Sequence, residues 1–353
     1  MGWKPSNFTK TKSEEYPNGF PKVDEEALVR YAKELSENKD SRQSEAVAAL
    51  AEWLVLQGRA SMLDTWFNNL GSDSRIHGRV NSCGASTRRM THSNPNTANI
   101  PSGAKAKYGH ECRSFWGVEP GRNLVLVGYD AAGLETAGLC HYLNNERATE
   151  ILLRPKPNDI HTANSKRLTE ALGRFVDREW GAKTSWYAWL YGAFPAKLGS
   201  IVGGDAKDGE IVVETFFRNV PGLKELIDDV QLEWTVSSGR LACIDGGYVI
   251  CPSKSAALNY RIQSAGTIAM KLAAILLDEE LKRKGIWFKK VGDIHDEGQI
   301  EGLESDAYEK GNIKRHIIGD VAVDCIRRAG IKLGFNVELG GDYRVGTDWS
   351  MTH

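Results

Sequence analysis

The chain has 353 residues, of which 41% are hydrophobic and 26% charged, and its formal net charge is -1 at pH 7. A chain of this length can form several subdomains and a sizeable core. The balanced charge gives no global basic signature of a nucleic-acid-binding protein. No apolar run approaches the roughly 20 residues that cross a bilayer. The opening segment MGWKPSNFTK also lacks the basic and apolar regions of a signal peptide, so we expect no membrane association.

The cysteines are scattered along the chain and form no C-x-x-C pair. This arrangement is typical of reduced packing residues, not of zinc ligands or a disulfide framework. We therefore expect a cytoplasmic protein. The residues concerned are Cys83, Cys112, Cys140, Cys243, Cys251 and Cys325.

The first hundred residues are predicted to be mostly helical. Val23 to Asn38 and Ser44 to Leu70 both repeat apolar residues at helical spacing after acidic first turns, and a short strand is expected at Arg75 to Asn81. The next segment, Ser86 to Arg113, concentrates Lys and Arg among Asn, Ser, Thr and Gly. A solvated loop has this composition, and so does a loop that contacts a phosphate backbone, so both interpretations stay open.

A buried strand is expected at Leu124 to Val127, because four consecutive apolar residues are typical of a strand covered on both faces. Asp130 and Gly133 follow it and lead into a helix. Helices are then predicted at Asn158 to Gly192, Asp205 to Gly239, Ser255 to Gly285 and Ile313 to Ala329. Strands are predicted at YVICP, before the third of these helices, and at GFNVELGG, after the last.

Lys289 to Gly302 reads as a hairpin with His295, Asp296 and Glu297 at its tip. Adjacent carboxylates repel each other and raise each other's pKa. A solvated tip is the more frequent explanation for an isolated pair of this kind, and a strongly cationic ligand is the other. With the strands grouped around Asp130 and Asp296, and helical blocks beside them, the predicted class is α+β.

If the strands of Asp130 and Asp296 share one antiparallel sheet, the two carboxylates converge. Two carboxylates with two Mg²⁺ ions about 4 Å apart form the clamp used in phosphoryl and nucleotidyl transfer. Hard oxygen ligands suit Mg²⁺, which keeps its other positions for phosphate oxygens and water. Such ions would neutralise the acidic hairpin tip.

Two helices carry polar stripes. Lys183, Tyr187 and Tyr191 repeat at helical spacing, which suits one phosphate contact and two flat surfaces for stacking; an amphipathic helix with a snorkelling lysine is equally compatible. Asn259 and Gln263 share a helix face and could read the minor-groove acceptors that all base pairs present in similar places. In isolation, a buried amide pair would be the more frequent explanation.

The motifs YDAAGLE, KTSWYAWLYG, NYRIQSAG and IHDE, in this order, resemble the polymerase motifs of family A (Pol I-like) DNA polymerases. Within this family the chain resembles the polymerase portion of the replicative enzymes of T-seven-type bacteriophages. The resemblance runs from GWKPSNFT through HGRVN, THSNPNTANIP and YGHECRSFWG to DWSMTH. It implies template-directed DNA synthesis from dNTPs on a primer-template, in phage DNA replication.

The family fold implied by the resemblance is a right hand with an antiparallel palm sheet. On that basis residues 1–70 are a partial helical thumb, 71–143 and 239–353 the palm, and 144–238 the helical fingers. We expect no exonuclease domain in this chain and hence no proofreading. A separately encoded exonuclease and thumb half, or a processivity factor, is an expected partner. Trp3, Phe8, Phe20 and Trp53 are candidates for the surface that such a partner would cover.

The resemblance also implies residue roles. Asp130 and Asp296, with the Ala131 carbonyl, hold two Mg²⁺ ions, for which Mn²⁺ is expected to substitute. Lys183 and His161 contact the incoming triphosphate, and Lys183 is the candidate general acid to pyrophosphate. The remaining roles are an accessory carboxylate near the primer end (Glu297), a steric gate that bonds to Tyr187 (Glu135), a sugar contact (Tyr187), stacking at the templating position (Tyr191), minor-groove readers (Arg89, Asn259, Gln263) and support of the primer-terminal phosphate (His295).

The chain departs from the family pattern at the start of its Lys183 helix. The family places an Arg four residues before the Lys, where this chain has Glu179, and the nearest arginine is Arg178. A glutamate facing a triphosphate would be repulsive. We therefore expect a locally shifted helix turn that brings Arg178 to the triphosphate instead.

Two alternatives remain open from the sequence. A single-subunit RNA polymerase shares the two aspartates and the Lys-Tyr helix, although Glu135 and Glu297 argue against it. A catalytically inactive DNA-binding subunit of a split polymerase is the other, and the intact Asp130, Lys183 and Asp296 argue against that one.

Overall fold

The computed structural model describes residues 8, 11, 13, 15–17, 19–20, 23, 25–37 (the backbone alone at 26, 30, 33 and 37), 41–103 and 106–353. The chain forms two compact units. One unit comprises Met1–Arg79 and Ser93–Arg113, and the other comprises Val80–His92 and Ser114–His353. The four-part division into thumb, palm and fingers stays a prediction.

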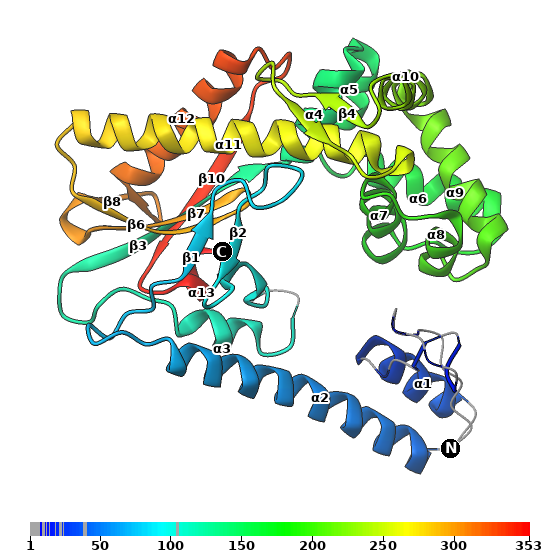
Figure 1. Cartoon of the computed structure of the whole chain (residues 1–353), viewed down its shortest axis with the longest axis horizontal. Helices are drawn as coiled ribbons and strands as arrows, with labels where there is room; N and C mark the ends of the chain where they lie inside the picture. Colours follow the sequence, from blue (N-terminus) through cyan, green and yellow to red (C-terminus); the bar gives the residue numbers. More distant parts are fainter. Residues whose placement is uncertain are drawn as a thin grey trace. The chain divides into compact units, whose positions relative to one another are not determined.

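The first unit is built on helices α1 (Glu25–Glu37) and α2 (Ser41–Asn68), labelled in Figure 1. Leu28 and Ala32 of α1 pack with Val47 and Ala51 of α2. Of the aromatic residues predicted to be uncovered, Phe8, Phe20 and Trp53 are exposed, and Trp3 lies outside the described residues. Helix α3 (Gly109–Ser114) and the 3₁₀ turn η1 (Thr97–Asn99) follow later in the chain.

The second unit contains a four-stranded antiparallel sheet in the order β10-β3-β7-β6. Its strands are β3 (Leu124–Ala132), β6 (Phe288–Ile294), β7 (Glu297–Leu303) and β10 (Gly340–Gly346). The predicted buried strand and hairpin are therefore present and adjacent, as Figure 1 shows. The closing strand begins at Gly340, later than the predicted GFNVELGG segment, most of which precedes it.

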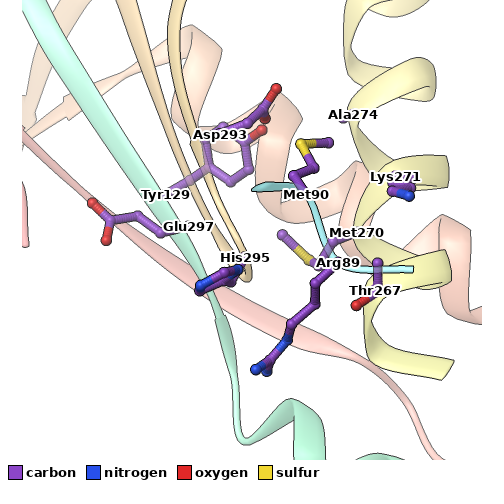
Figure 2. A pocket seen from close by; sticks show the side chains of 10 residues that line it. All are labelled: Arg89, Met90, Tyr129, Thr267, Met270, Lys271, Ala274, Asp293, His295 and Glu297. Atoms are coloured by element: carbon purple, nitrogen blue, oxygen red, sulfur yellow. The ribbon is translucent and has the colours of Figure 1, made fainter. Parts of the chain in front are cut away.

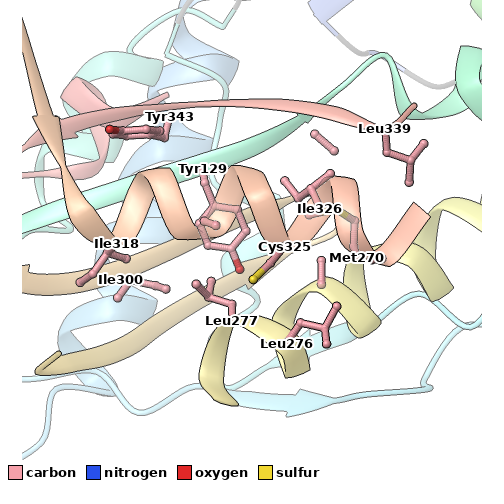
Figure 3. Packing of buried hydrophobic residues seen from close by; sticks show 14 of the residues in the cluster. Tyr129, Met270, Leu276, Leu277, Ile300, Ile318, Cys325, Ile326, Leu339 and Tyr343 are labelled. Carbon is pink, nitrogen blue, oxygen red and sulfur yellow. The ribbon is translucent and has the colours of Figure 1, made fainter. Parts of the chain in front are cut away.

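One face of this sheet is apolar because the strands alternate. Val125, Val127 and Tyr129 of β3 belong to a single buried cluster with Ile300 of β7. Helices α11 (Ala257–Arg283) and α12 (Ile317–Leu333) supply the other side of that cluster. Figure 3 shows several of their side chains beside Tyr129, among them Leu277, Cys325 and Ile326. The alternate positions, including Asp130, consequently face the opposite side of the sheet.

A helical cluster follows β3. Trp186, Phe216 and Leu198 are fully buried in its core. Its elements are α4 (Leu134–Leu143), α5 (Glu146–Leu152), α6 (Ile160–Leu172), the π-helix η2 (Arg178–Lys183), α7 (Thr184–Leu190), α8 (Pro195–Ile201), α9 (Ala206–Asn219) and α10 (Leu223–Val236).

Among the smaller elements, strand β9 differs from the helix that the sequence predicts at this point. A helix was predicted from Ile313, but Ile313–His316 is strand β9, which pairs with β8 (Ala307–Lys310), and α12 begins at Ile317. The imidazole of His316 accepts a hydrogen bond from the backbone N–H of Ile318 and so caps the helix there. The others are β1 (Arg79–Asn81), β2 (Thr91–Ser93), β4 (Arg240–Ala242), β5 (Tyr248–Ile250), η3 (Lys254–Ala256), η4 (Glu304–Asp306) and α13 (Trp349–Thr352).

Among the described residues, no helix combines the length and apolar character that a bilayer crossing requires.

Gly298 tests how tightly the sheet is packed beneath the hairpin tip. It lies opposite Tyr129, and a Cβ at this position would overlap the tyrosine ring. Gly298→Ala should therefore lower the free energy of unfolding by roughly 1–3 kcal/mol, the usual effect of overpacking. Gly58→Ala is the matched control, because Gly58 lies inside α2 with open space around it. That substitution should stabilise by about 0.5–1 kcal/mol. Urea unfolding curves of equal midpoint for the two variants would contradict the packing described here.

Candidate active site

The main chain brings Asp130 and Asp296 together. Asp130 lies on β3 directly opposite Glu297, the first residue of β7. Asp296 forms the tip between β6 and β7, and its carbonyl accepts a hydrogen bond of 3.1 Å from the backbone N–H of Ala131. His295, before it, has a left-handed φ of 60°, which is uncommon for a residue other than glycine. Hydrogen bonding of the backbone thus fixes the two aspartates as neighbours.

Their carboxylates carry surplus negative charge. Burial, with the nearby charges of Asp296 and Glu297, raises the pKa of Asp130 to about 7. Burial, with the charge of Glu135, also raises the pKa of Asp296, although the guanidinium of Arg89 partly opposes this. Such shifts are characteristic of sites that bind a cation or transfer a proton.

Glu135 lies at the start of α4, behind Gly133, whose φ of 57° allows the sharp turn from β3. Its Oε1 accepts a hydrogen bond of 3.0 Å from the Tyr191 hydroxyl and lies 3.5 Å from the Arg89 guanidinium. The predicted bond between Glu135 and Tyr187 is therefore wrong for this structure. The Tyr187 ring packs against His161, with centroids 5.7 Å apart, whereas Tyr191, one turn later at the end of α7, reaches Glu135.

Two of the three predicted minor-groove readers, Arg89 and Gln263, line one pocket together with acidic groups. Gln263 of α11 is part of its wall, and Asn259 lies one turn earlier on the same helix. Arg89, Glu135, His295 and Asp296 also line it. An adjoining pocket, shown in Figure 2, shares Arg89 and His295 and extends to Met270 and Lys271.

The predicted triphosphate contacts lie on the helical cluster. Arg178 and Lys183 are the two ends of η2, a π-helix that holds one more residue per turn than an α-helix. A shifted turn is thus present at this point, and the contact of Arg178 with a triphosphate stays a prediction. In this structure the Arg178 guanidinium contacts the carboxylates of Asp159 and Glu179, and Lys183 Nζ lies 3.2 Å from Glu179 Oε2.

His161 lies beside these cations on the first turn of α6. Its side chain is only 9% exposed. Burial, assisted by the charges of Arg178, Lys183 and Lys156, lowers its pKa to about 4. The imidazole is therefore neutral at physiological pH, where it can donate or accept a hydrogen bond.

Comparison with known proteins decides the family. The family model described as DNA polymerase family A matches residues 7–351. The chain belongs to family A of the DNA polymerases.

Two relatives carry the name DNA-directed DNA polymerase. The chain is 32% identical to that of Enterobacteria phage T3 and 31% identical to that of Escherichia phage T7, over 100% of its own length and 50% of theirs. It therefore spans about half of each of these relatives. A solved structure titled POL domain of Pol1 from M. smegmatis, in complex with DNA primer-template and dNTP, has the same fold. Its TM-score is 0.74 at 21% identity, with 98% of this chain and 58% of that chain covered.

Family A DNA polymerases use divalent metal ions, and the acidic residues near the end of β3 and at the β6–β7 tip suit them. Asp130 and Asp296 offer hard carboxylate oxygens, which Mg²⁺ prefers, and their raised pKa values show negative charge that a cation would relieve. Within the described part of the chain, no group of three or more His, Cys, Asp and Glu side chains could enclose an ion. The fit is to an open site that leaves coordination positions for substrate.

Glu297 is held in a way that the sequence analysis did not predict. It is 6% exposed, and its Oε1 accepts hydrogen bonds from Gln299 Nε2 (2.6 Å) and from the indole N–H of Trp349. Its Oε2 lies 3.2 Å from the His353 ring. Figure 2 shows the Glu297 side chain pointing away from Arg89 and Met270. Its predicted part near the primer end stays a prediction, but the observed partners anchor α13 to β7. The sequence signal for this arrangement was the alternation of polar residues along β7, at Glu297, Gln299 and Glu301.

The raised pKa of Asp130 predicts a pH-dependent stability in the absence of metal. The folded chain binds this proton more tightly than the unfolded chain does, because the pKa of about 7 exceeds the ordinary value near 4. Its contribution to stability is therefore present at low pH and is lost as the pH rises from about 4 through 7. In EDTA, Asp130→Asn should match the wild type near pH 4. At pH 8 it should exceed the wild type by roughly 1–3 kcal/mol.

Urea unfolding at the two pH values measures this difference. Asp278→Asn is the control, because Asp278 is a surface residue on α11 that pairs with Lys282. Added Mg²⁺ should narrow the gap at pH 8 by stabilising the wild type. A wild type that is more stable than Asp130→Asn at pH 8 in EDTA would contradict the electrostatic account.

Proposed function

We propose that the chain catalyses template-directed DNA synthesis in phage DNA replication. The primer 3′-OH attacks the α-phosphate of a dNTP, a P–O bond forms, and pyrophosphate leaves. The observation that carries the proposal is the pair of half-buried aspartates, Asp130 near the end of β3 and Asp296 at the hairpin tip, next to a pocket lined by Arg89 and Gln263. Family membership and phage relatives along the whole chain support it.

In this mechanism Asp130 and Asp296, with the Ala131 carbonyl, would hold two Mg²⁺ ions, which Mn²⁺ could replace. When bound, the ions supply charge stabilisation at the attacking and leaving oxygens. The protein's own part is mostly positioning, because phosphoryl transfer requires little covalent chemistry from side chains. The hydrogen bond from Ala131 to Asp296 keeps the two carboxylates in register during turnover.

The helical cluster binds the nucleotide in this proposal. Arg178 and Lys183 contact the triphosphate, and Lys183 Nζ donates a proton to the departing pyrophosphate. His161, being neutral, contributes a hydrogen bond without adding charge.

Glu135 excludes a ribose 2′-OH, and the hydrogen bond from Tyr191 orients its carboxylate until the template base arrives. Tyr187 packs beside the sugar, and Tyr191 stacks at the templating position. The duplex end is read by Arg89, Asn259 and Gln263, with His295 at the primer-terminal phosphate. These roles, and a separately encoded exonuclease half or processivity factor, remain predictions.

Asp296→Asn should abolish incorporation, because it removes half of the protein's metal clamp. We expect a loss of at least roughly 1000-fold in the single-nucleotide rate, about 4 kcal/mol of barrier. Binding of primer-template should change little, since that affinity comes from phosphate contacts. Asp278→Asn serves as the control here as well and should retain activity. Near-normal extension by Asp296→Asn in a Mg²⁺-dependent assay would show that the clamp is assigned to the wrong residues.

Glu135→Ala should admit ribonucleotides, because it opens the space that the longer side chain fills. The preference for dNTP over rNTP should fall roughly 100-fold, the scale of discrimination by pocket size. Glu135→Gln keeps the length of the side chain and should preserve most of the preference, which separates bulk from charge. Competitive single-nucleotide incorporation measures the ratio, and an unchanged ratio in Glu135→Ala would rule out the gate.

A further inference from the structure

A cluster of opposite charges surrounds η2. Glu179, inside the π-helix, has its carboxylate between three cations. Lys156 Nζ lies 3.4 Å from Oε1, Lys183 Nζ lies 3.2 Å from Oε2, and Arg178 contacts Oε1 directly. Asp159, the N-cap of α6, binds the other side of the Arg178 guanidinium. We call these five residues the Glu179 cluster.

We propose that Glu179 occupies the place of the dNTP triphosphate in the nucleotide-free chain, and that an incoming dNTP displaces it and gains Lys156 as an additional phosphate contact. This inference rests on the proposed function, since it takes Arg178 and Lys183 as triphosphate contacts.

The chemistry of the cluster supports an exchange of anions. A carboxylate and a phosphate both present oxygens that accept charge-assisted hydrogen bonds from guanidinium and ammonium groups. One anion can therefore replace the other on the same donors. Lys156 faces the same carboxylate as Arg178 and Lys183, so a phosphate in that position would meet all three cations.

The charge balance favours the exchange. Three cations and two carboxylates leave the Glu179 cluster with a formal charge of +1 (3 − 2). With Glu179 turned away the balance is +2 (3 − 1), which suits a polyanion better. His161 adds no charge to this count, because its pKa of about 4 keeps it neutral.

The exposure of the side chains determines which bonds break. Glu179, Lys156 and Lys183 are 46%, 69% and 40% exposed, and ion pairs at such positions are weak and screened by salt. Arg178 and Asp159 are only 21% and 12% exposed, and Arg178 Nε also donates to the Thr162 hydroxyl at 3.1 Å. Glu179 can therefore leave while Asp159 keeps Arg178 in position.

The consequence is a nucleotide site in which the Glu179 carboxylate competes with the incoming triphosphate for the same cations. A ligand with a single phosphate can contact few of the three cations that Glu179 already contacts. A triphosphate can contact all three at once and so replace every ion pair of Glu179. Glu179 should therefore raise the KM for dNTP and the dissociation constant of any triphosphate, with little effect on the rate of the chemical step.

The first test is an equilibrium measurement that needs no catalysis. Binding of inorganic tripolyphosphate to the full chain, without primer or dNTP, is measured by calorimetry for the wild type, Glu179→Gln and Glu214→Gln. The last is a matched control, because Glu214 lies on α9 in the same helical cluster and forms an ion pair with Arg218 on that helix. We expect Glu179→Gln to bind tripolyphosphate roughly 3–10-fold more tightly, because the variant loses the weak, exposed ion pairs that a phosphate would otherwise have to break. Added salt should reduce the difference. Glu214→Gln should match the wild type.

Lys156→Gln tests the additional contact. It should weaken tripolyphosphate binding in the Glu179→Gln background, where no carboxylate competes for the ammonium. In single-nucleotide incorporation, Glu179→Gln should lower the KM for dNTP and leave kcat unchanged. Equal or weaker tripolyphosphate binding by Glu179→Gln would overturn the inference, as would no effect of Lys156→Gln in that background.

The two proposals fail separately. A wild-type chain that extends no primer, but whose Glu179→Gln variant binds tripolyphosphate more tightly, would refute the proposed function and leave the Glu179 cluster as an anion site. A chain that extends primers normally, with no difference between Glu179→Gln and Glu214→Gln, would refute the competitor alone.

Discussion

The enforced proximity of Asp130 and Asp296 is the constraint on which the rest of the site depends. The backbone creates it, through the pairing of β3 with β7 and the hydrogen bond from Ala131 to Asp296. Two half-buried carboxylates in this position repel each other, and burial together with that repulsion raises the pKa of Asp130. The apolar face that α11 and α12 cover holds the strands in place despite it. A stable core on one side of the sheet thus permits an unfavourable charge arrangement on the other.

Glu297, on the same sheet, has different surroundings from Asp130. Its oxygens meet Gln299, Trp349 and His353, so hydrogen-bond donors of the protein satisfy them. The charges that act most strongly on Asp130 are those of other acids, Asp296 and Glu297. Glu297 and Asp130, which are paired across β7 and β3, therefore differ in their partners. Under the proposed function Asp130 would bind a cation, whereas hydrogen bonds within the protein already satisfy Glu297.

Much of this fold could be predicted from local pattern. The apolar run before Asp130, the alternation on both sides of Asp296 and the helical spacing from Ser255 to Gly285 correspond to β3, the β6–β7 hairpin and α11. The start of α12 could not be predicted in the same way, because Ile313 to His316 is apolar and basic in an order that suits either a strand or a helix. Its pairing with β8 decides the outcome, and that contact is not encoded in the segment itself.

The candidate site, like the fold, could be predicted from local pattern only where tertiary contacts do not decide the outcome. Sequence motifs placed Asp130, Asp296 and Glu135 in one predicted site, but did not show which tyrosine would contact Glu135. That choice depends on where α7 lies along its axis relative to Glu135, which tertiary packing such as that of Trp186 against Phe216 determines. The spacing of Tyr187 and Tyr191 does not show this position, because both residues share one helix face.

The π-helix accounts for the position of Arg178 relative to Lys183. In an α-helix, residues five positions apart lie about 140° apart around the axis, which would turn Arg178 away from Lys183. Helix η2 begins after its N-cap Asp177, and its wider π-turn brings its first and last residues to the same side. The arginine and the lysine then contact a common carboxylate, and Glu179 itself supplies that carboxylate. The π-turn therefore keeps the two cations together with an anion between them. Under the proposed function, that anion is the group that an incoming nucleotide would displace.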